Sequence, residues 1–157
     1  PHYPKRDFDL SVQAAGYIPF SAHVAARPAE EKMRTIELEP LTQKDQSFTL
    51  HNIYFDYDSA NIKTASQPVL TRLASFLQLN PHLRIKIVGH TDRHGSSRYN
   101  QLLSQKRAQS VLEALVRLGI SVDRLSSSGA GYQQPLSTDA SKEADRMNRR
   151  TEFQIIN

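Results

Sequence analysis

Residues 83–95 read Leu-Arg-Ile-Lys-Ile-Val-Gly-His-Thr-Asp-Arg-His-Gly. The first six residues are typical of a short apolar strand, which Gly89 is expected to end. Glycines on both sides of the following loop let its backbone turn sharply and approach a ligand closely. Because ligands collect at the carboxyl ends of strands in α/β sheets, this stretch predicts a carboxylate, Asp92, at the edge of a site. The alternative is a loop aspartate that forms an Asx turn or caps the next helix.

Helical patterns lie on both sides of this strand. Apolar residues at helical spacing predict one amphipathic helix over residues 66–79 and another over residues 104–118. Further strands are expected at 48–55, 124–128 and 150–156. The order of these elements predicts an α/β (α+β) sandwich with βαβαββ topology, in which a mixed sheet of about four strands carries helices on one face.

Arg107 is the second candidate for the site. If Ser104 is the N-cap of the second helix, Arg107 lies in the first turn, where free backbone N–H groups and a guanidinium together favour an anion. The alternative is an arginine that pairs with a nearby carboxylate, such as Asp92 itself. If the two residues instead face each other across a crevice, they suit a zwitterion, with its ammonium on Asp92 and its carboxylate on Arg107.

The basic charge is concentrated in the second part of the chain. Residues 48–157 hold fourteen Lys/Arg against nine Asp/Glu, a net charge of +5, whereas residues 1–47 have a net charge of −1. This balance suits an anionic partner, although charge alone favours the simpler interpretation of a solvated basic surface. The basic run at residues 146–150 lacks the flanking aromatic residues of a single-strand nucleic-acid platform, so no nucleic-acid partner is expected.

His90, Asp92 and His94 alternate and invite a metal interpretation. Zinc usually needs a third protein ligand of suitable spacing, which the other histidines do not offer. We therefore expect no metal, with His90 packed against the sheet and His94 facing solvent. The chain has no cysteine and no recognisable nucleophile elbow, P-loop or zinc-protease motif, so neither catalysis nor a cofactor is expected.

Four motifs occur along the second part of the chain in a fixed order. They are Tyr-Phe-Asp-Tyr-Asp-Ser-Ala at 54–60, Gly-His-Thr-Asp at 89–92 with Gly-Ser at 95–96, Asn-x-x-Leu-Ser-x-x-Arg-Ala at 100–108, and Gly-x-Gly at 129–131 with Asn-Arg-Arg-Thr-Glu-Phe at 148–153. Together they resemble the OmpA-like C-terminal domain family, and the resemblance covers residues 48–157.

This resemblance implies a periplasmic domain that binds peptidoglycan non-covalently and has no catalytic activity. It implies that Asp92 holds the amine and Arg107 the carboxylate of meso-diaminopimelate in the stem peptide. Four further residues line the same pocket by correspondence with the family: Asp58, Thr91, Asn100 and Arg150. The competing hypothesis is a metal-dependent enzyme that acts on cell-wall peptide through His90, Asp92 and His94.

Residues 1–47 lie outside that resemblance. Alternating residues predict strands over Phe8–Ala14 and Thr35–Glu39, which we interpret as the tail of a β-domain, with a linker at 41–47. Two short strands cannot bury a core of their own, so this segment is expected to dock on the second domain or stay mobile. It is similar to the end of a carboxypeptidase-regulatory-like domain.

A carboxypeptidase-regulatory-like domain ahead of an OmpA-like one resembles the architecture of large Bacteroidetes envelope lipoproteins. That likeness suggests an outer-membrane assembly, such as the type IX secretion system, as partner. No apolar run approaches the roughly 18 residues that a transmembrane helix needs, so the chain itself is not expected to be transmembrane. We expect a periplasmic location, with attachment to the outer membrane through a missing upstream part of the protein.

Overall fold

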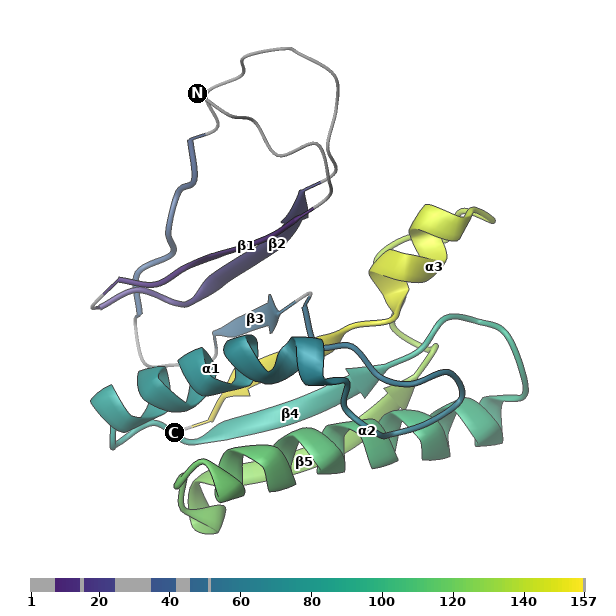
Figure 1. Ribbon diagram of the computed structural model, residues 1–157. Coiled ribbons are helices and arrows are strands. Elements are labelled where there is room, and N and C mark those ends of the chain that lie inside the picture. Colours follow the sequence, from purple (N-terminus) through teal and green to yellow (C-terminus); the bar gives the residue numbers. More distant parts are fainter. Residues whose placement is uncertain (1–7, 15, 25–34, 42–45, 51, 157) are drawn as a thin grey trace.

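A mixed sheet of four strands forms the centre of the protein (Figure 1). The computed structural model describes residues 8–14, 16–24, 35–41, 46–50 and 52–156. The strand order is β3-β6-β4-β5, in which β4 and β5 are parallel and the other neighbours are antiparallel. This confirms the predicted mixed sheet. The strands are β3 (Ser47–Leu50), β4 (Ile85–His90), β5 (Leu125–Gly131) and β6 (Thr151–Ile155).

Two helices cover one face of this sheet, as the sequence predicts (Figure 1). They are α1 (Gln67–Leu79), which follows the 3-10 turn η1 (Thr64–Ser66), and α2 (Ser97–Arg117), which leads through the 3-10 turn η2 (Val122–Arg124) into β5. Their apolar stripes and the inward residues of the strands form one core, because alternate strand residues point to the same face. Its largest fully buried apolar side chains are Phe153, Leu70, Leu73, Leu77, Leu83, Ile85, Ile87, Leu115, Ile155 and Val111.

Two glycines let α2 lie directly on the sheet. A Cβ atom at Gly89 would overlap the carbonyl group of Ser104, and one at Gly129 would meet both Ser104 and Gln105. Ser104 Oγ accepts a hydrogen bond from Gly131 N at 3.0 Å, and Gln105 Oε1 accepts one from Gly129 N at 2.7 Å. The buried polar face of α2 is therefore held by the strand backbone, which fixes the helix beside the end of β4.

Several predicted boundaries are wrong. Gly89 does not end its strand, because β4 continues to His90 and uses the glycine for the close contact with α2. The strand predicted over 48–55 ends at Leu50, since the chain from Tyr54 to Lys63 folds into a loop with its own hydrogen bonds. α2 begins two turns earlier than predicted, at Ser97, with Ser96 Oγ accepting from Tyr99 N. The sequence also missed the short helix α3 (Lys142–Asn148).

The N-terminal segment forms a β-hairpin. It consists of β1 (Phe8–Val12) and β2 (Phe20–Val24), which pair antiparallel. The sequence did not predict β2. Gly16, with a φ of 76°, lies in the reversal between the two strands. The strand predicted over Thr35–Glu39 is wrong, since this segment lies along residues 16–18 with an isolated bridge between Tyr17 and Pro40.

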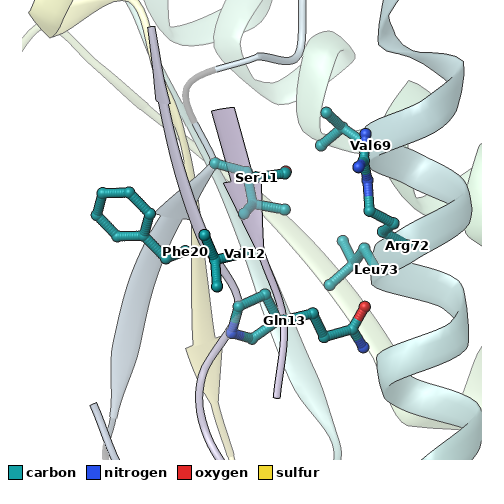
Figure 2. Close-up of a pocket in the computed structure, with 9 residues that line it drawn as sticks. Ser11, Val12, Gln13, Phe20, Val69, Arg72 and Leu73 are labelled. Atoms are coloured by element: carbon teal, nitrogen blue, oxygen red, sulfur yellow. The ribbon is translucent and has the colours of Figure 1, made fainter. Parts of the chain in front are cut away.

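The hairpin docks on the part of the chain that forms the four-stranded sheet and its helices. Ile18 is only 4% exposed and belongs to the common core. Figure 2 shows the gap between the hairpin and α1, which is lined by Ser11, Val12 and Gln13 on one side and by Val69, Arg72 and Leu73 on the other. The ring of Phe20 points away from α1. The expectation that this segment docks holds for its described residues, whereas its origin in a carboxypeptidase-regulatory-like domain stays a prediction.

Among the described residues, no helix combines the length and the apolar character needed to cross a membrane.

Candidate functional site

The candidate site lies where the chain leaves β4. Asp92 Oδ1 accepts a hydrogen bond from His94 N at 3.1 Å, so the residue does form the Asx turn that the sequence left open. Asp92 Oδ2 accepts a second hydrogen bond from Arg149 Nη1 at 2.6 Å. The carboxylate therefore has a structural role in its loop and is still 15% exposed.

Asp92 is ionised in this arrangement. Burial would raise the pKa of its carboxyl group, but hydrogen bonds from Arg149 and His94 outweigh burial and hold the pKa below the ordinary value of 3.8. A carboxylate that keeps its charge and stays partly exposed can accept a ligand cation.

Arg107 lies in the middle of α2, not in its first turn, because the helix begins at Ser97. The predicted contribution of a helix N-terminus at this residue is therefore wrong. Instead, Arg107 Nε donates to Ser59 O at 2.9 Å, and the guanidinium carbon lies 5.0 Å from the centre of the Phe55 ring. Within the described part of the chain, the two terminal nitrogens of Arg107 have no hydrogen-bond partner, so this end of the fork remains available to a ligand.

Asp92 and Arg107 belong to one electrostatic environment without forming a direct pair. Burial and the charge of Arg149 lower the pKa of Arg107, while the charges of Asp92 and Asp58 raise it. The guanidinium remains protonated, since arginine does not lose its proton in proteins. Asp92 pairs with Arg149, so the sequence alternative of an Asp92–Arg107 salt bridge is wrong.

Three further predicted residues surround these two. Asn100 is buried and its Nδ2 donates to His94 O at 2.9 Å, which fixes the loop. Thr91 is buried, its N–H donates to Gly131 O at 2.9 Å, and its hydroxyl oxygen has no hydrogen-bond partner among the residues that the structure describes. Asp58 is exposed and has a φ of 51°. It lies in the same loop as Ser59, whose carbonyl oxygen accepts the hydrogen bond from Arg107.

Arg150 lies in a separate buried cluster. Its Nη2 donates to Gln134 O at 3.1 Å and lies 3.6 Å from Glu152, while its Nε and Nη1 have no partner in the described structure. His90 is packed beside it, as predicted, with Nε2 3.4 Å from Glu152. Burial and the charge of Arg150 lower the pKa of His90 to about 4, so the imidazole is neutral at pH 7. A ligand contact by Arg150 stays a prediction.

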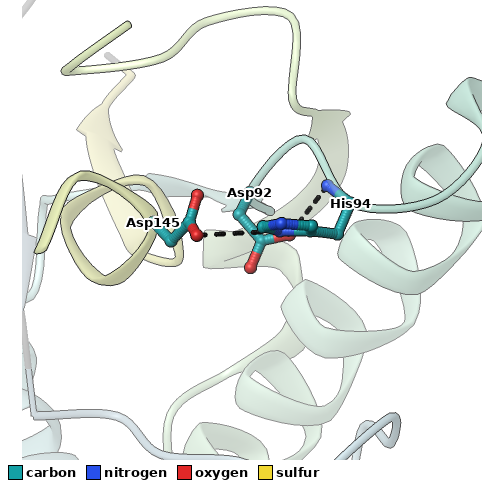
Figure 3. Close-up of side chains that lie close together, drawn as sticks. All are labelled: Asp92, His94 and Asp145. Atoms are coloured by element: carbon teal, nitrogen blue, oxygen red, sulfur yellow. Dashed lines mark hydrogen bonds and ion pairs between the residues drawn. The ribbon is translucent and has the colours of Figure 1, made fainter. Parts of the chain in front are cut away.

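A different trio offers metal ligands. Asp92, His94 and Asp145 present one ligand atom each within 4.8 Å of one another, as Figure 3 shows. His94 Nδ1 lies 3.2 Å from Asp92 and 3.7 Å from Asp145 on α3, and the His94 side chain is 74% exposed, as predicted. His90 does not belong to this group, so the described residues do not support the competing hypothesis of a His90/Asp92/His94 metal centre. A metal here would also compete with Arg149 for Asp92.

Sequence reasoning missed Arg149 and Asp145. Both belong to the segment around α3, which is seven residues long and buries only Ala144 and Asn148, so it carries little periodic signal. Ser141 accepts from Ala144 N, and acidic residues follow it in the first turn, which is the local pattern that could have revealed the helix.

Comparison with known proteins gives a consistent family. Residues 54–149 match the OmpA family. Outer membrane protein Omp38 of Acinetobacter baumannii is 34% identical over 90% of this chain and 40% of its own length. The probable lipoprotein YiaD of Escherichia coli is 34% identical over 67% of this chain and 48% of its own length. The chain thus spans less than half the length of either curated relative.

Solved structures share the fold. The peptidoglycan-associated lipoprotein of Burkholderia pseudomallei superposes with a TM-score of 0.62 and 33% identity, over 66% of this chain and 88% of that one. The cell wall anchor of the T6SS of Pseudomonas aeruginosa gives a TM-score of 0.60 and 29% identity, over 70% and 78% of the two chains. The α/β fold predicted from the sequence is confirmed by these likenesses.

Proposed function

The chain belongs to the OmpA family, and from this premise we propose that it binds peptidoglycan non-covalently through the meso-diaminopimelate of the stem peptide. Binding would anchor an envelope assembly to the cell wall, without catalysis. Support comes from two similar structures, those of a peptidoglycan-associated lipoprotein and of a cell wall anchor.

One observation carries the proposal. Asp92 has an ionised, partly exposed carboxylate, and the terminal nitrogens of the Arg107 guanidinium have no hydrogen-bond partner among the described residues; the two groups belong to one electrostatic environment. A ligand that carries an ammonium and a carboxylate on the same carbon matches this pair. The free end of meso-diaminopimelate has this chemistry, and charge-assisted hydrogen bonds to both groups would orient it. Asn100 would hold the loop, and Thr91 would offer its unpartnered hydroxyl.

The wider assembly is part of the proposal. Outer membrane proteins and a lipoprotein among the relatives support a place at the outer membrane, facing the periplasm. The resemblance of residues 1–47 to the end of a carboxypeptidase-regulatory-like domain supports an envelope lipoprotein as the parent. Components of the type IX secretion system would then be partners, and pull-down of the parent complex from an envelope extract would test this.

Binding to purified sacculi tests the ligand. The full chain should co-sediment with sacculi that contain diaminopimelate and much less with sacculi that contain lysine, because lysine lacks the carboxylate that Arg107 would hold. The Asp92→Asn/Arg107→Ala double variant should lose binding while circular dichroism shows it folded. Arg117→Ala, at the exposed end of α2, is the matched control and should bind like the wild type. Equal retention on both kinds of sacculi would exclude the proposed site.

A further inference from the structure

Arg149 forms an ion pair with Asp92, the carboxylate to which the ligand ammonium is proposed to bind. It follows the last residue of α3, its side chain is 46% exposed, and its Nη1 lies 2.6 Å from Asp92 Oδ2. The other oxygen of Asp92 accepts from His94 N. Both carboxylate oxygens are therefore engaged before any ligand arrives.

An ammonium that docks on Asp92 would come close to the guanidinium that already donates to Oδ2, and the two cations would repel each other. Two cations on one carboxylate would lie within a few ångströms of each other, and like charges at that distance in a partly buried site repel. Ligand binding therefore favours a state in which Arg149 has left Asp92. A released guanidinium needs another anion, since otherwise the lost ion pair reduces the affinity for the ligand.

Besides Asp92, two acidic residues of the described part of the chain bear on the surroundings of Arg149. Asp145, one turn earlier on α3, already lies 3.7 Å from His94, and Asp58 acts on Arg107. Arg149 acts electrostatically on Arg107, so the two guanidinium groups share one environment. The arrangement suits a ligand with one ammonium and two carboxylates, in which each carboxylate meets one arginine.

We propose that Arg149 is a specificity-determining residue: it releases Asp92 to the ligand ammonium and binds a second carboxylate of the stem peptide. The inference rests on the proposed function. A stem tripeptide of L-alanine, γ-linked D-glutamate and meso-diaminopimelate has two such groups besides the zwitterion, the terminal carboxylate and the free carboxylate of the glutamate. Either can form the bidentate contact that a planar guanidinium prefers.

Calorimetry with four synthetic tripeptides identifies which of the two carboxylates Arg149 binds. They are the free acid, the terminal amide, the glutamate amide and the double amide, and all four keep the ammonium and carboxylate of the zwitterion. For the wild type, amidation of the carboxylate that Arg149 binds should weaken the affinity for the tripeptide by about ten- to a hundredfold, as expected for the loss of a hydrogen bond between charged groups. Amidation of the other carboxylate should have little effect.

Variants assign the discrimination to Arg149. Arg149→Gln should bind the free acid and the amides with equal affinity, and Arg149→Lys should recover part of the preference. Arg149→Gln should also bind the double amide at least as tightly as the wild type does, because the cation that competes for Asp92 is gone. Arg146→Gln is the matched control, since Arg146 is an exposed cation of α3 without an ion pair among the described residues. It should keep the wild-type preference.

The outcomes distinguish the two levels of the argument. If the wild type binds none of the four tripeptides, the proposed function itself fails. If the wild type binds all four equally, or Arg149→Gln keeps the preference for the acid, the function stands and the role of Arg149 is excluded. Weaker binding of the double amide by Arg149→Gln would show that Arg149 supports Asp92 and does not compete for it.

Discussion

Arg149 Nη1 lies 2.6 Å from Asp92 Oδ2, although 57 residues separate the two along the chain. The contact joins the loop after β4 to the end of α3, and it keeps a negative charge beside Arg107. The proposed ligand must bind in competition with this internal ion pair, so the charges of three residues decide the affinity together.

Replacement of Arg107 by lysine should weaken binding to the diaminopimelate tripeptide by about tenfold, and replacement by alanine by up to about a hundredfold. Lysine keeps the positive charge but cannot reproduce the planar fork that bonds a carboxylate twice, nor the hydrogen bond from Nε to Ser59 O. Calorimetry with purified variants measures the difference. Wild-type affinity of the lysine variant for the tripeptide would show that only the positive charge matters at this position.

Acid should weaken binding only at low pH. The ligand ammonium needs the charged form of the Asp92 carboxyl group, whose folded pKa lies below 3.8. This charge, and the stabilisation that its ion pair gives the fold, is present above that value and is lost as the pH falls through the folded pKa. Arg149→Gln removes a lowering hydrogen bond and leaves the burial, so the titration of Asp92 should shift to higher pH. An NMR titration of the Asp92 carboxyl carbon measures both proteins, and coincident curves would contradict the assignment.

His90 should make the fold sensitive to mild acid. Burial and Arg150 lower its pKa from 6.5 to about 4, so between these values the unfolded chain binds a proton that the folded chain does not. Stability should therefore fall by about 1–3 kcal/mol as the pH drops through this window. Urea unfolding at pH 7 and pH 4.5 should show a smaller fall for His90→Asn, whereas the exposed His82→Asn should behave like the wild type.

Chelation should leave binding to sacculi unchanged. The trio of Asp92, His94 and Asp145 has metal-ligand spacing, but Asp92 already pairs with Arg149, and the proposed ligand needs no metal. Sedimentation with sacculi in the presence and absence of EDTA tests this, together with metal analysis of the purified protein. Stoichiometric metal and hydrolysis of stem peptides would favour the competing hypothesis of an enzyme.

Gly89→Ala should destabilise the fold by about 1–3 kcal/mol, the usual cost of overpacking. Its methyl group would overlap the backbone of Ser104, so α2 must move away from β4, and Arg107 moves with it. Binding should fall as well, which distinguishes this change from a simple loss of stability. Ser128→Ala in β5, on the face of the sheet away from α2, is the control for both measurements.

The sequence by itself determined the elements of the sheet domain. Period-2 and period-3.6 patterns place the strands and both long helices, because each turns an apolar face to one core. Hydrophobic periodicity did not predict the start of α2, since the first buried residues of this helix are the polar Asn100 and Ser104. They are buried because they bond the backbone of His94 and Gly131, and a hydrophobic period does not record such bonds.

Only the tertiary structure decided the partners within the site. Asp92 and Arg107 could be chosen from their residue types and motifs, but which arginine pairs with Asp92 depends on where α3 packs. That helix has two buried residues and no periodic stripe. Its end is held by hydrogen bonds of Asn148 with Leu136 and Ser137 and by the ion pair of Arg149 with Asp92. Side-chain pairs across such distances depend on the folded chain path, which local patterns do not encode. For this reason Arg149 and Asp145 could be assigned to the site only from the tertiary structure.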